Sequence, residues 1–419
     1  MIHRPGIGHV VNSQALRTRR AAAPVAGIDA MTPTAAPAAP TVQVRDTRDL
    51  LSVVPYALGY RPAECLLVVC VRPGGDLGLV ARTDLADLRR PADRAEVAEL
   101  VATRAAQDGT VSAWVVVYTA DDVGPGTPAR AAADAFSAAL DAVVPEHEAW
   151  VVGPQRYRSL DCTDPVCCPT DGFGLDGLES TEPGAQLVLS GRAPMPSRDA
   201  LYRIPRADQA QRNLASRAAR RWDRARTDAC DAGEERGWRS RSFDAWTEAT
   251  AVVAAGGNPS PALLGRLAAA LEDRWVRDAV LLWFVPGRAA LAATVAAGET
   301  TDQETDAAVG EAIATVVDPD AARRPDEERT RVCVALLESV VAHAARRRTA
   351  APLTLLAFLA WWSGEGARAS YRCAEALRVD DAYRLGLLLA AALDAAVPPG
   401  WVRARSIHGL GEGSGPDLR

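Results

Sequence analysis

The stretch that decides the fold of the first half is Glu64–Val71, ECLLVVCV, a nearly continuous run of apolar residues. A short run of this kind, rich in β-branched residues, is typical of a strand that is covered on both faces. Gly74-Gly75-Asp76 follows it and predicts a turn into a second, antiparallel strand at 77–85, LGLVARTDL.

Helices and strands alternate on both sides of this hairpin. A short helix capped by Asp46 or Thr47 precedes it, and a helix that begins at Pro91 follows it. Further strands are predicted at 113–119, 148–153 and 156–162, and a further helix at 128–143. We therefore expect an α/β N-terminal domain with a mixed, layered sheet.

The second half has a helical period throughout. From Phe243 onward apolar residues recur three and four positions apart, which predicts an all-α helical domain. An apolar repeat predicts one long core helix, because it runs through Leu263, Leu267, Leu271 and Trp275 and continues to Trp283. Residues 352–396 predict three further helices.

Changes in composition suggest the boundaries. Residues 1–41 are rich in alanine and proline, so we expect a disordered tail, and Met31 is an alternative start. Residues 206–240 are rich in arginine and lack an aliphatic stripe, which favours a charged, solvated linker helix. The expected segments are a tail at 1–41, the α/β domain at 42–205, the linker at 206–240, the helical domain at 241–403 and a flexible tail at 404–419.

Composition excludes several classes of protein. The chain of 419 residues exceeds what one core usually organises, and its hydrophobic and charged contents are those of a globular protein. A net charge of −6 argues against a dedicated nucleic-acid binder. All 47 basic residues are arginine, which removes every lysine mechanism and is typical of a high-GC genome.

The longest apolar run, 350–362, is too short for a membrane span, and residues 1–20 do not resemble a signal peptide, so we expect a cytoplasmic protein.

The sharpest chemical feature is the cysteine-rich loop at 161–169, DCTDPVCCP, which carries Cys162, Cys167 and Cys168. A structural zinc site has four ligands, usually from two C-x2-C knuckles. This loop has the spacing C-x4-C-C, and the sequence contains no second knuckle. His147, Asp161 or Asp164 could supply a fourth ligand. A metal site, a redox site and a rigid structural loop with a Cys162–Cys167 disulfide all remain open. The missing knuckle favours the structural interpretation.

Two further candidates lie near strand ends. In GYRPAEC (59–65), with Arg82 and Asp84 on the next strand, Cys65 could be a nucleophile. This loop precedes its strand, whereas ligands bind beyond the carboxyl ends of strands in open α/β sheets, so we favour a packing role. Thr119, Asp121 and Asp122 follow a strand and could hold a cation, although turn formation is the commoner use of such residues.

The remaining polar features favour structural roles. The arginine stripe indicates a solvated helix face with one aromatic residue, Trp222, and His343 lies on the apolar side of its helix, as a satisfied core histidine does. No nucleotide-binding or hydrolase motif is present. The stripe consists of Arg212, Arg217, Arg220, Arg221, Arg224 and Arg226.

Three stretches resemble a known family. They are VPYALGYRP (54–62) with ARTDL (81–85), RYRSLDCTDPVCCP (156–169) with SGRAPMPSRDAL (190–201), and LTLLAF to AAVPP (353–399). Together they resemble the bacterial domain-of-unknown-function 4192 family, of the high-GC, actinobacterial type. The resemblance implies a fold and no assigned activity. The family typically has serine at the position of Cys65.

Residues 352–381 also resemble one tetratricopeptide hairpin, with small residues at Gly364, Ala369, Cys373 and Ala376. Such repeats need about three copies for a stable concave surface, and one is visible. We expect a protein of unknown function, a non-enzymatic interaction or regulatory protein that binds a protein partner through its helical half. The alternative is a metal- or thiol-dependent enzyme or sensor built on the 161–168 loop, with zinc as the cofactor. Neither nucleic acid nor membrane is expected as a partner.

Overall fold

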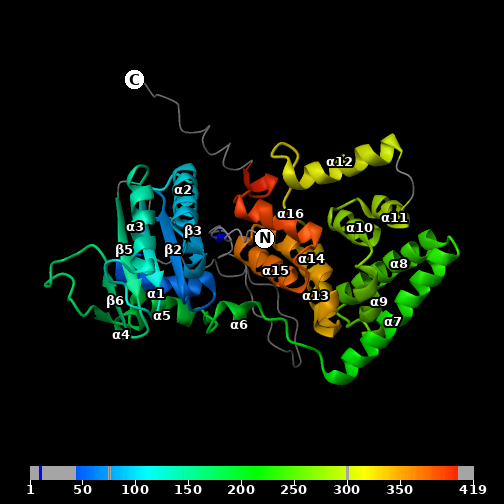
Figure 1. The fold of residues 1–419 in the computed structure, drawn as a ribbon, viewed down its shortest axis with the longest axis horizontal. Coiled ribbons are helices and arrows are strands. Elements are labelled where there is room, and N and C mark those ends of the chain that lie inside the picture. The colour runs from blue at the N-terminus through cyan, green and yellow to red at the C-terminus, as the bar shows by residue number, and fades with distance from the viewer. Residues whose placement is uncertain are drawn as a thin grey trace, which may run out of the picture. The chain divides into compact units, whose positions relative to one another are not determined.

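The computed structural model describes residues 9–11, 44–73, 75, 77–144, 146–298 and 302–403 (Figure 1). The chain divides into two compact units, Met1–Arg203 and Ile204–Arg419. The flexible tail expected at 404–419 lies outside the described residues, as does most of the tail expected at 1–41. Within the range of that tail the structure describes β1 (His9–Val11), which pairs with β3.

The first unit is a mixed sheet with helices, as predicted. The strands lie in the order β1-β3-β2-β4-β5-β6-β7, and only β4 and β5 pair in parallel. Its elements after β1 are α1 (Thr47–Leu58), β2 (Cys65–Val71), β3 (Leu77–Asp84), the 3-10 helix η2 (Leu85–Leu88), α2 (Pro91–Gln107), β4 (Ser112–Tyr118), α3 (Pro128–Asp141), β5 (Glu146–Val152), β6 (Arg156–Ser159), β7 (Phe173–Gly174), α4 (Asp176–Glu179), α5 (Glu182–Leu189) and α6 (Arg198–Tyr202).

Strand β2 is buried on both faces, as its apolar run predicted. Leu66, Val68 and Cys70 pack in one core cluster with apolar residues of α2 and α3. Cys65, Leu67 and Val69 pack on the opposite face with residues of α1. Successive side chains of a strand point to opposite faces, so a strand between two helical layers needs apolar residues at every position.

The direction of β2 decides which loops meet. It runs antiparallel to both neighbours, β3 and β4, so β3, β4 and β5 all run the other way. The first residue of β2 therefore lies at the sheet edge where β3, β4 and β5 end. Register places Asp84 opposite Cys65 and Cys65 opposite Tyr118, in a row across three strands.

The second unit is entirely helical in its described part, and Trp246, Phe284 and Trp362 lie in its core. No described helix has both the length and the apolar character of a membrane span. The helices are α7 (Gln209–Asp231), α8 (Glu235–Ala254), α9 (Pro261–Ala270), α10 (Arg274–Phe284), α11 (Ala289–Ala297), α12 (Gln303–Val317), α13 (Glu327–His343), the 3-10 helix η3 (Arg346–Arg348), α14 (Ala350–Trp362), α15 (Gly366–Val379) and α16 (Arg384–Asp394).

The long core helix expected over 263–283 is wrong. Helix α9 ends at Ala270 and α10 begins at Arg274. Asp273 caps the second helix, because its carboxylate accepts hydrogen bonds from the backbone N–H groups of Trp275 (2.9 Å) and Val276 (3.4 Å). The apolar period continues through the break because both helices contribute to the same core.

The solvated linker helix expected over 206–240 is also wrong. The segment contains α7 and the first turns of α8, and α7 is packed within the helical unit. Ala215, Ala218 and Ala219 are buried, and α7 approaches α9 so closely that a Cβ on Gly265 would lie 2.1 Å from the Ala215 carbonyl oxygen. Alanine and glycine replace the aliphatic stripe here because two backbones in close approach leave no room for larger side chains.

Candidate functional site

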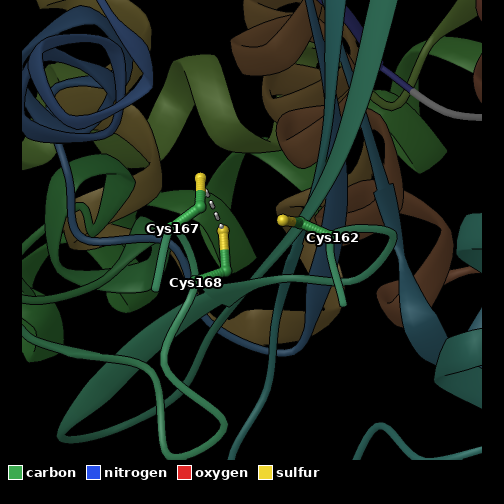
Figure 2. Close-up of side chains that lie close together, drawn as sticks. All are labelled: Cys162, Cys167 and Cys168. Carbon is green, nitrogen blue, oxygen red and sulfur yellow. Dashed lines mark hydrogen bonds between the residues drawn. The ribbon is translucent and has the colours of Figure 1, made fainter. Parts of the chain in front are cut away.

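The three thiols of the 161–169 loop converge (Figure 2). The sulfur atoms of Cys162, Cys167 and Cys168 all lie within 4.8 Å of one another, and those of Cys167 and Cys168 are 3.7 Å apart. In the described part of the chain, no other group of three or more His, Cys, Asp or Glu side chains meets the same criterion. We call these three residues the three-cysteine cluster.

Short-range hydrogen bonds bend the loop into this arrangement. The backbone N–H of Cys168 donates to the Asp164 carbonyl at 2.7 Å, and the N–H of Val166 donates to the Asp164 carboxylate at 2.9 Å. Ser159 Oγ accepts from the N–H of Cys162 at 3.1 Å. The side chains of adjacent cysteines usually point apart. In the turn around Pro165, however, the sulfur atoms of Cys167 and Cys168 lie close together.

Two thiols of the cluster, Cys162 and Cys168, have pKa values that are shifted in opposite directions. The backbone of Asp164, and then the side chain of Cys168, hydrogen bond to the sulfur of exposed Cys162 and lower its pKa. The pKa of Cys168 is raised, first by loss of hydration and then by the neighbouring thiols. Cys162 therefore forms a thiolate at lower pH than Cys168 does.

The sulfur positions fit a thiophilic metal ion, with three protein ligands. Tetrahedral Zn²⁺ with Zn–S bonds of about 2.3 Å holds its sulfur ligands about 3.8 Å apart, close to the spacing of Cys167 and Cys168. Of the three residues considered as a fourth ligand, Asp164 accepts a hydrogen bond from Val166 within the loop, and the other two have partners outside it. Asp161 accepts from the Ala149 N–H and lies 3.6 Å from Arg130, while the His147 ring contacts the Val144 carbonyl and Asp141.

The 59–65 loop lies at the ligand-binding edge of the sheet, which corrects our expectation. It precedes its strand, but β2 is antiparallel, so the loop lies beside the carboxyl ends of β3 and β4. The Glu64 carboxylate accepts hydrogen bonds from Thr119 Oγ1 (3.1 Å) and the Ala120 N–H (3.0 Å). The 59–65 loop and the loop that follows β4 at Thr119, which are remote in sequence, are therefore in direct contact.

Cys65 itself is not an activated nucleophile. It is fully buried, and burial raises the pKa of its thiol to about 11, against the opposing effect of Arg82. Arg82 donates from Nη2 to Asp84 at 2.6 Å. A buried neutral thiol of this kind packs as a small apolar group.

Thr119, Asp121 and Asp122 line a cavity of about 150 Å³ beyond the ends of the parallel strands β4 and β5. Arg156 and Arg158 also line it, so the cavity presents both signs of charge. Among the described residues these carboxylates belong to no group of three or more close ligand atoms, so the structure adds no support to the cation alternative.

Sequence reasoning gave no role to Tyr60 and missed Tyr118, which lies opposite Cys65, and Arg198, which lies near Asp84. Residues 59–61 pair with Met195 through two backbone hydrogen bonds of 2.9 Å each. This pairing brings Arg198 to within 3.8 Å of Asp84. The one available signal was that SGRAPMPSRDAL accompanies the other stretches in the family resemblance.

The other polar candidates have structural roles. Both ring nitrogens of His343 have partners, the Ser339 carbonyl at 2.8 Å and the Gln211 side chain at 2.9 Å. Trp222 donates to Ser242 at 2.9 Å and is covered by a guanidinium group 4.2 Å from its ring centre. These contacts fit packing within the helical unit.

Comparisons with curated proteins and with solved structures give no match. A family model described as domain of unknown function (DUF4192) matches residues 48–400, which is most of the chain. The match spans the sheet, the three-cysteine cluster and the helical unit through α16. The chain therefore belongs to the DUF4192 family.

Proposed function

We propose that this is a non-enzymatic regulatory protein whose three-cysteine cluster binds a thiophilic metal ion, with Zn²⁺ as the first candidate. The observation that carries the proposal is the convergence of three sulfur atoms within 4.8 Å on an exposed loop. Thiolates bind Zn²⁺ strongly, and three protein ligands leave one position open for a solvent molecule or an exchanging ligand. An exposed site of this kind suits reversible binding, as a sensor requires.

The state of the thiols supports a cytoplasmic location. All eight cysteines of the chain are free, including the three of the cluster. Thiols stay reduced in the cytoplasm and are oxidised in secretory compartments, so a thiol-based metal site requires a reducing environment.

Metal analysis of the full chain, purified reduced and exposed to one equivalent of Zn²⁺, tests the proposal. We expect about one bound ion per chain in the wild type and loss of binding in Cys162→Ser and Cys167→Ser. Cys230→Ser is the matched control, because Cys230 is an exposed thiol outside the cluster. Absence of Zn²⁺ from the wild type, or its retention in both cluster variants, would contradict the proposal.

A second candidate function, protein interaction through the helical unit, rests on a different observation. Leu387 and Leu388 are adjacent on α16 and are 47% and 61% exposed. The tetratricopeptide-like positions Ala369, Cys373 and Ala376 are buried, so α16 is the better candidate for contacting a partner.

Affinity capture with the full chain tests this second candidate function. A partner that wild type retains and that a Leu387→Asp, Leu388→Asp variant loses would support it. Leu214→Asp on α7 is the control, because Leu214 is equally exposed at 47%. Equal capture by the wild type and the double variant would count against a role for α16.

A further inference from the structure

We propose that the cavity beyond the carboxyl ends of β4 and β5 binds a free α-amino acid, with a preference for a basic side chain. The cavity has a volume of about 150 Å³ and lies within the α/β unit, and we call it the strand-end cavity. The residues of the three-cysteine cluster do not line it, so the proposal does not depend on metal binding there.

The position of the strand-end cavity follows from the sheet. Strands β4 and β5 are parallel neighbours joined through α3, and residues that follow each strand line the cavity. Backbone pairing continues past the strand ends, because the Thr119 N–H donates to the Val152 carbonyl at 3.2 Å and the Gly153 N–H donates to the Arg156 carbonyl at 2.8 Å. Open α/β sheets bind ligands in crevices at the carboxyl ends of their strands. The cavity therefore lies where this fold offers a ligand site with fixed backbone walls.

The lining combines buried apolar residues with charged residues that reach solvent. Val123, Val151 and Tyr157 line the cavity and are buried. Ligand pockets commonly combine such apolar walls with a few polar groups. A cavity of about 150 Å³ encloses a group of about six non-hydrogen atoms, such as benzene. The head of an α-amino acid, with its ammonium, carboxylate, Cα and Cβ atoms, has this size. The charged lining residues are exposed or half-buried, and they are Asp121, Asp122, Arg156, Arg158 and Asp171.

The two guanidinium groups of the lining are held by backbone carbonyls. Arg156 donates to the Gly172 carbonyl at 3.0 Å, and Arg158 donates to the Val123 carbonyl at 3.2 Å. Neither forms an ion pair with a carboxylate of the described residues. Each guanidinium group has five N–H donors, so both are fixed in place and retain donors for a ligand.

The three carboxylates of the lining also lack partners. No group of the described residues donates a hydrogen bond to the side chain of Asp121, Asp122 or Asp171. Their backbone is nevertheless held, since the Asp121 N–H donates to Thr119 Oγ1 at 3.1 Å. Gly172, which follows Asp171, has φ +74°, and a Cβ there would lie 2.6 Å from a carbonyl oxygen of β6. The turn that carries Asp171 therefore requires glycine to approach β6.

Unpaired charges of both signs around one cavity favour a zwitterionic ligand. The carboxylate of an amino acid would accept charge-assisted hydrogen bonds from Arg156 and Arg158, and its ammonium group would donate to the aspartates. The three carboxylates outnumber the two guanidinium groups, so the lining keeps a net negative charge. A second positive charge on the ligand would balance it, which favours a basic amino acid over an acidic one.

Calorimetric titration of the full chain with L-lysine and L-arginine tests the proposal. We expect saturable binding at one site per chain and weaker binding of L-glutamate. Cadaverine lacks the carboxylate of lysine and 6-aminohexanoate lacks its α-ammonium group, so each should bind about tenfold more weakly than L-lysine. No saturable binding of either basic amino acid would overturn the proposal, as would an analogue or L-glutamate that binds as tightly as L-lysine.

Variants connect the binding to the strand-end cavity. Arg156→Gln keeps a donor for the Gly172 carbonyl but removes the charge, and Asp121→Asn removes one carboxylate, so each should weaken L-lysine affinity about tenfold. Arg89→Gln and Asp199→Asn are the matched controls, because both residues are exposed in the same unit and do not line the cavity. Circular dichroism checks that each variant is folded. Unchanged affinity in Arg156→Gln or in Asp121→Asn, or an equal loss in the controls, would overturn the proposal.

Discussion

Replacement of Asp273 by alanine should destabilise the helical unit far more than loss of an ordinary helix cap. Asp273 is 2% exposed and caps α10 with two backbone hydrogen bonds. Its second oxygen, Oδ2, pairs with Arg226 at 3.1 Å and with Arg239 at 3.3 Å. The substitution therefore removes a cap and leaves two guanidinium groups without this partner.

The two losses have different magnitudes. Loss of an N-cap costs about 1 kcal/mol. Breaking a buried ion pair by removal of one partner costs about 3–5 kcal/mol, but Arg226 is 42% exposed and Arg239 retains Glu235 at 3.3 Å, so we assign about 2 kcal/mol to this loss. Asp273→Ala should cost about 3 kcal/mol in total. Asp273→Asn keeps the cap and should cost about 2 kcal/mol.

Urea denaturation, followed by tryptophan fluorescence and circular dichroism, measures these differences. Asp326→Ala is the matched control, because Asp326 caps α13 from an exposed position and its loss should cost only about 1 kcal/mol. A cost for Asp273→Ala no greater than for Asp326→Ala would refute the contribution of the ion pairs. If Asp273→Ala and Asp273→Asn lowered the free energy of unfolding equally, the separate contributions assigned to the helix cap and to the ion pairs would be refuted.

Two further predictions concern packing and thiol reactivity. Gly265→Ala should cost about 2 kcal/mol or more in the same urea assay, because its Cβ would lie 2.1 Å from a carbonyl oxygen of α7, whereas Gly310→Ala on open α12 should gain about 0.5–1 kcal/mol. A neutral Gly265→Ala would contradict the close approach of the two helices. Cys162 should react with iodoacetamide at lower pH than Cys230, because its pKa is lowered while Glu235 raises that of Cys230, and the thiolate is the reactive form. Mass spectrometry of peptides alkylated across a pH series checks the order, and coincident pH profiles would contradict it.

Much of the fold was predictable because it depends on local patterns. The run at 64–71 predicted a strand buried on both faces, and the structure confirms this packing. The break at Asp273 was misread because the apolar period is the same in one helix and in two consecutive helices that share a core. The packing of α7 was missed because its buried face is made of alanines, which carry little hydropathy signal.

The candidate site was predictable only in its residue types. The sequence identified Cys162, Cys167 and Cys168, but their convergence depends on the turn around Pro165. The role of the 59–65 loop was misjudged because strand direction could not be read from the residues. A loop before a strand lies at the opposite edge from the ligand-binding loops only if that strand runs parallel to its neighbours.

The sequence by itself determined the alternation of helices and strands in the α/β half, the helical second half and the cysteine spacing, because these follow from side-chain period and turn chemistry within short segments. Only the tertiary structure decided that the 59–65 loop meets Thr119 and Ala120 at one edge of the sheet. Their meeting depends on hydrogen-bond register between strands and on the pairing of residues 59–61 with Met195. Such long-range pairings depend on the free energy of the whole sheet and its core, and no single segment of the sequence specifies them.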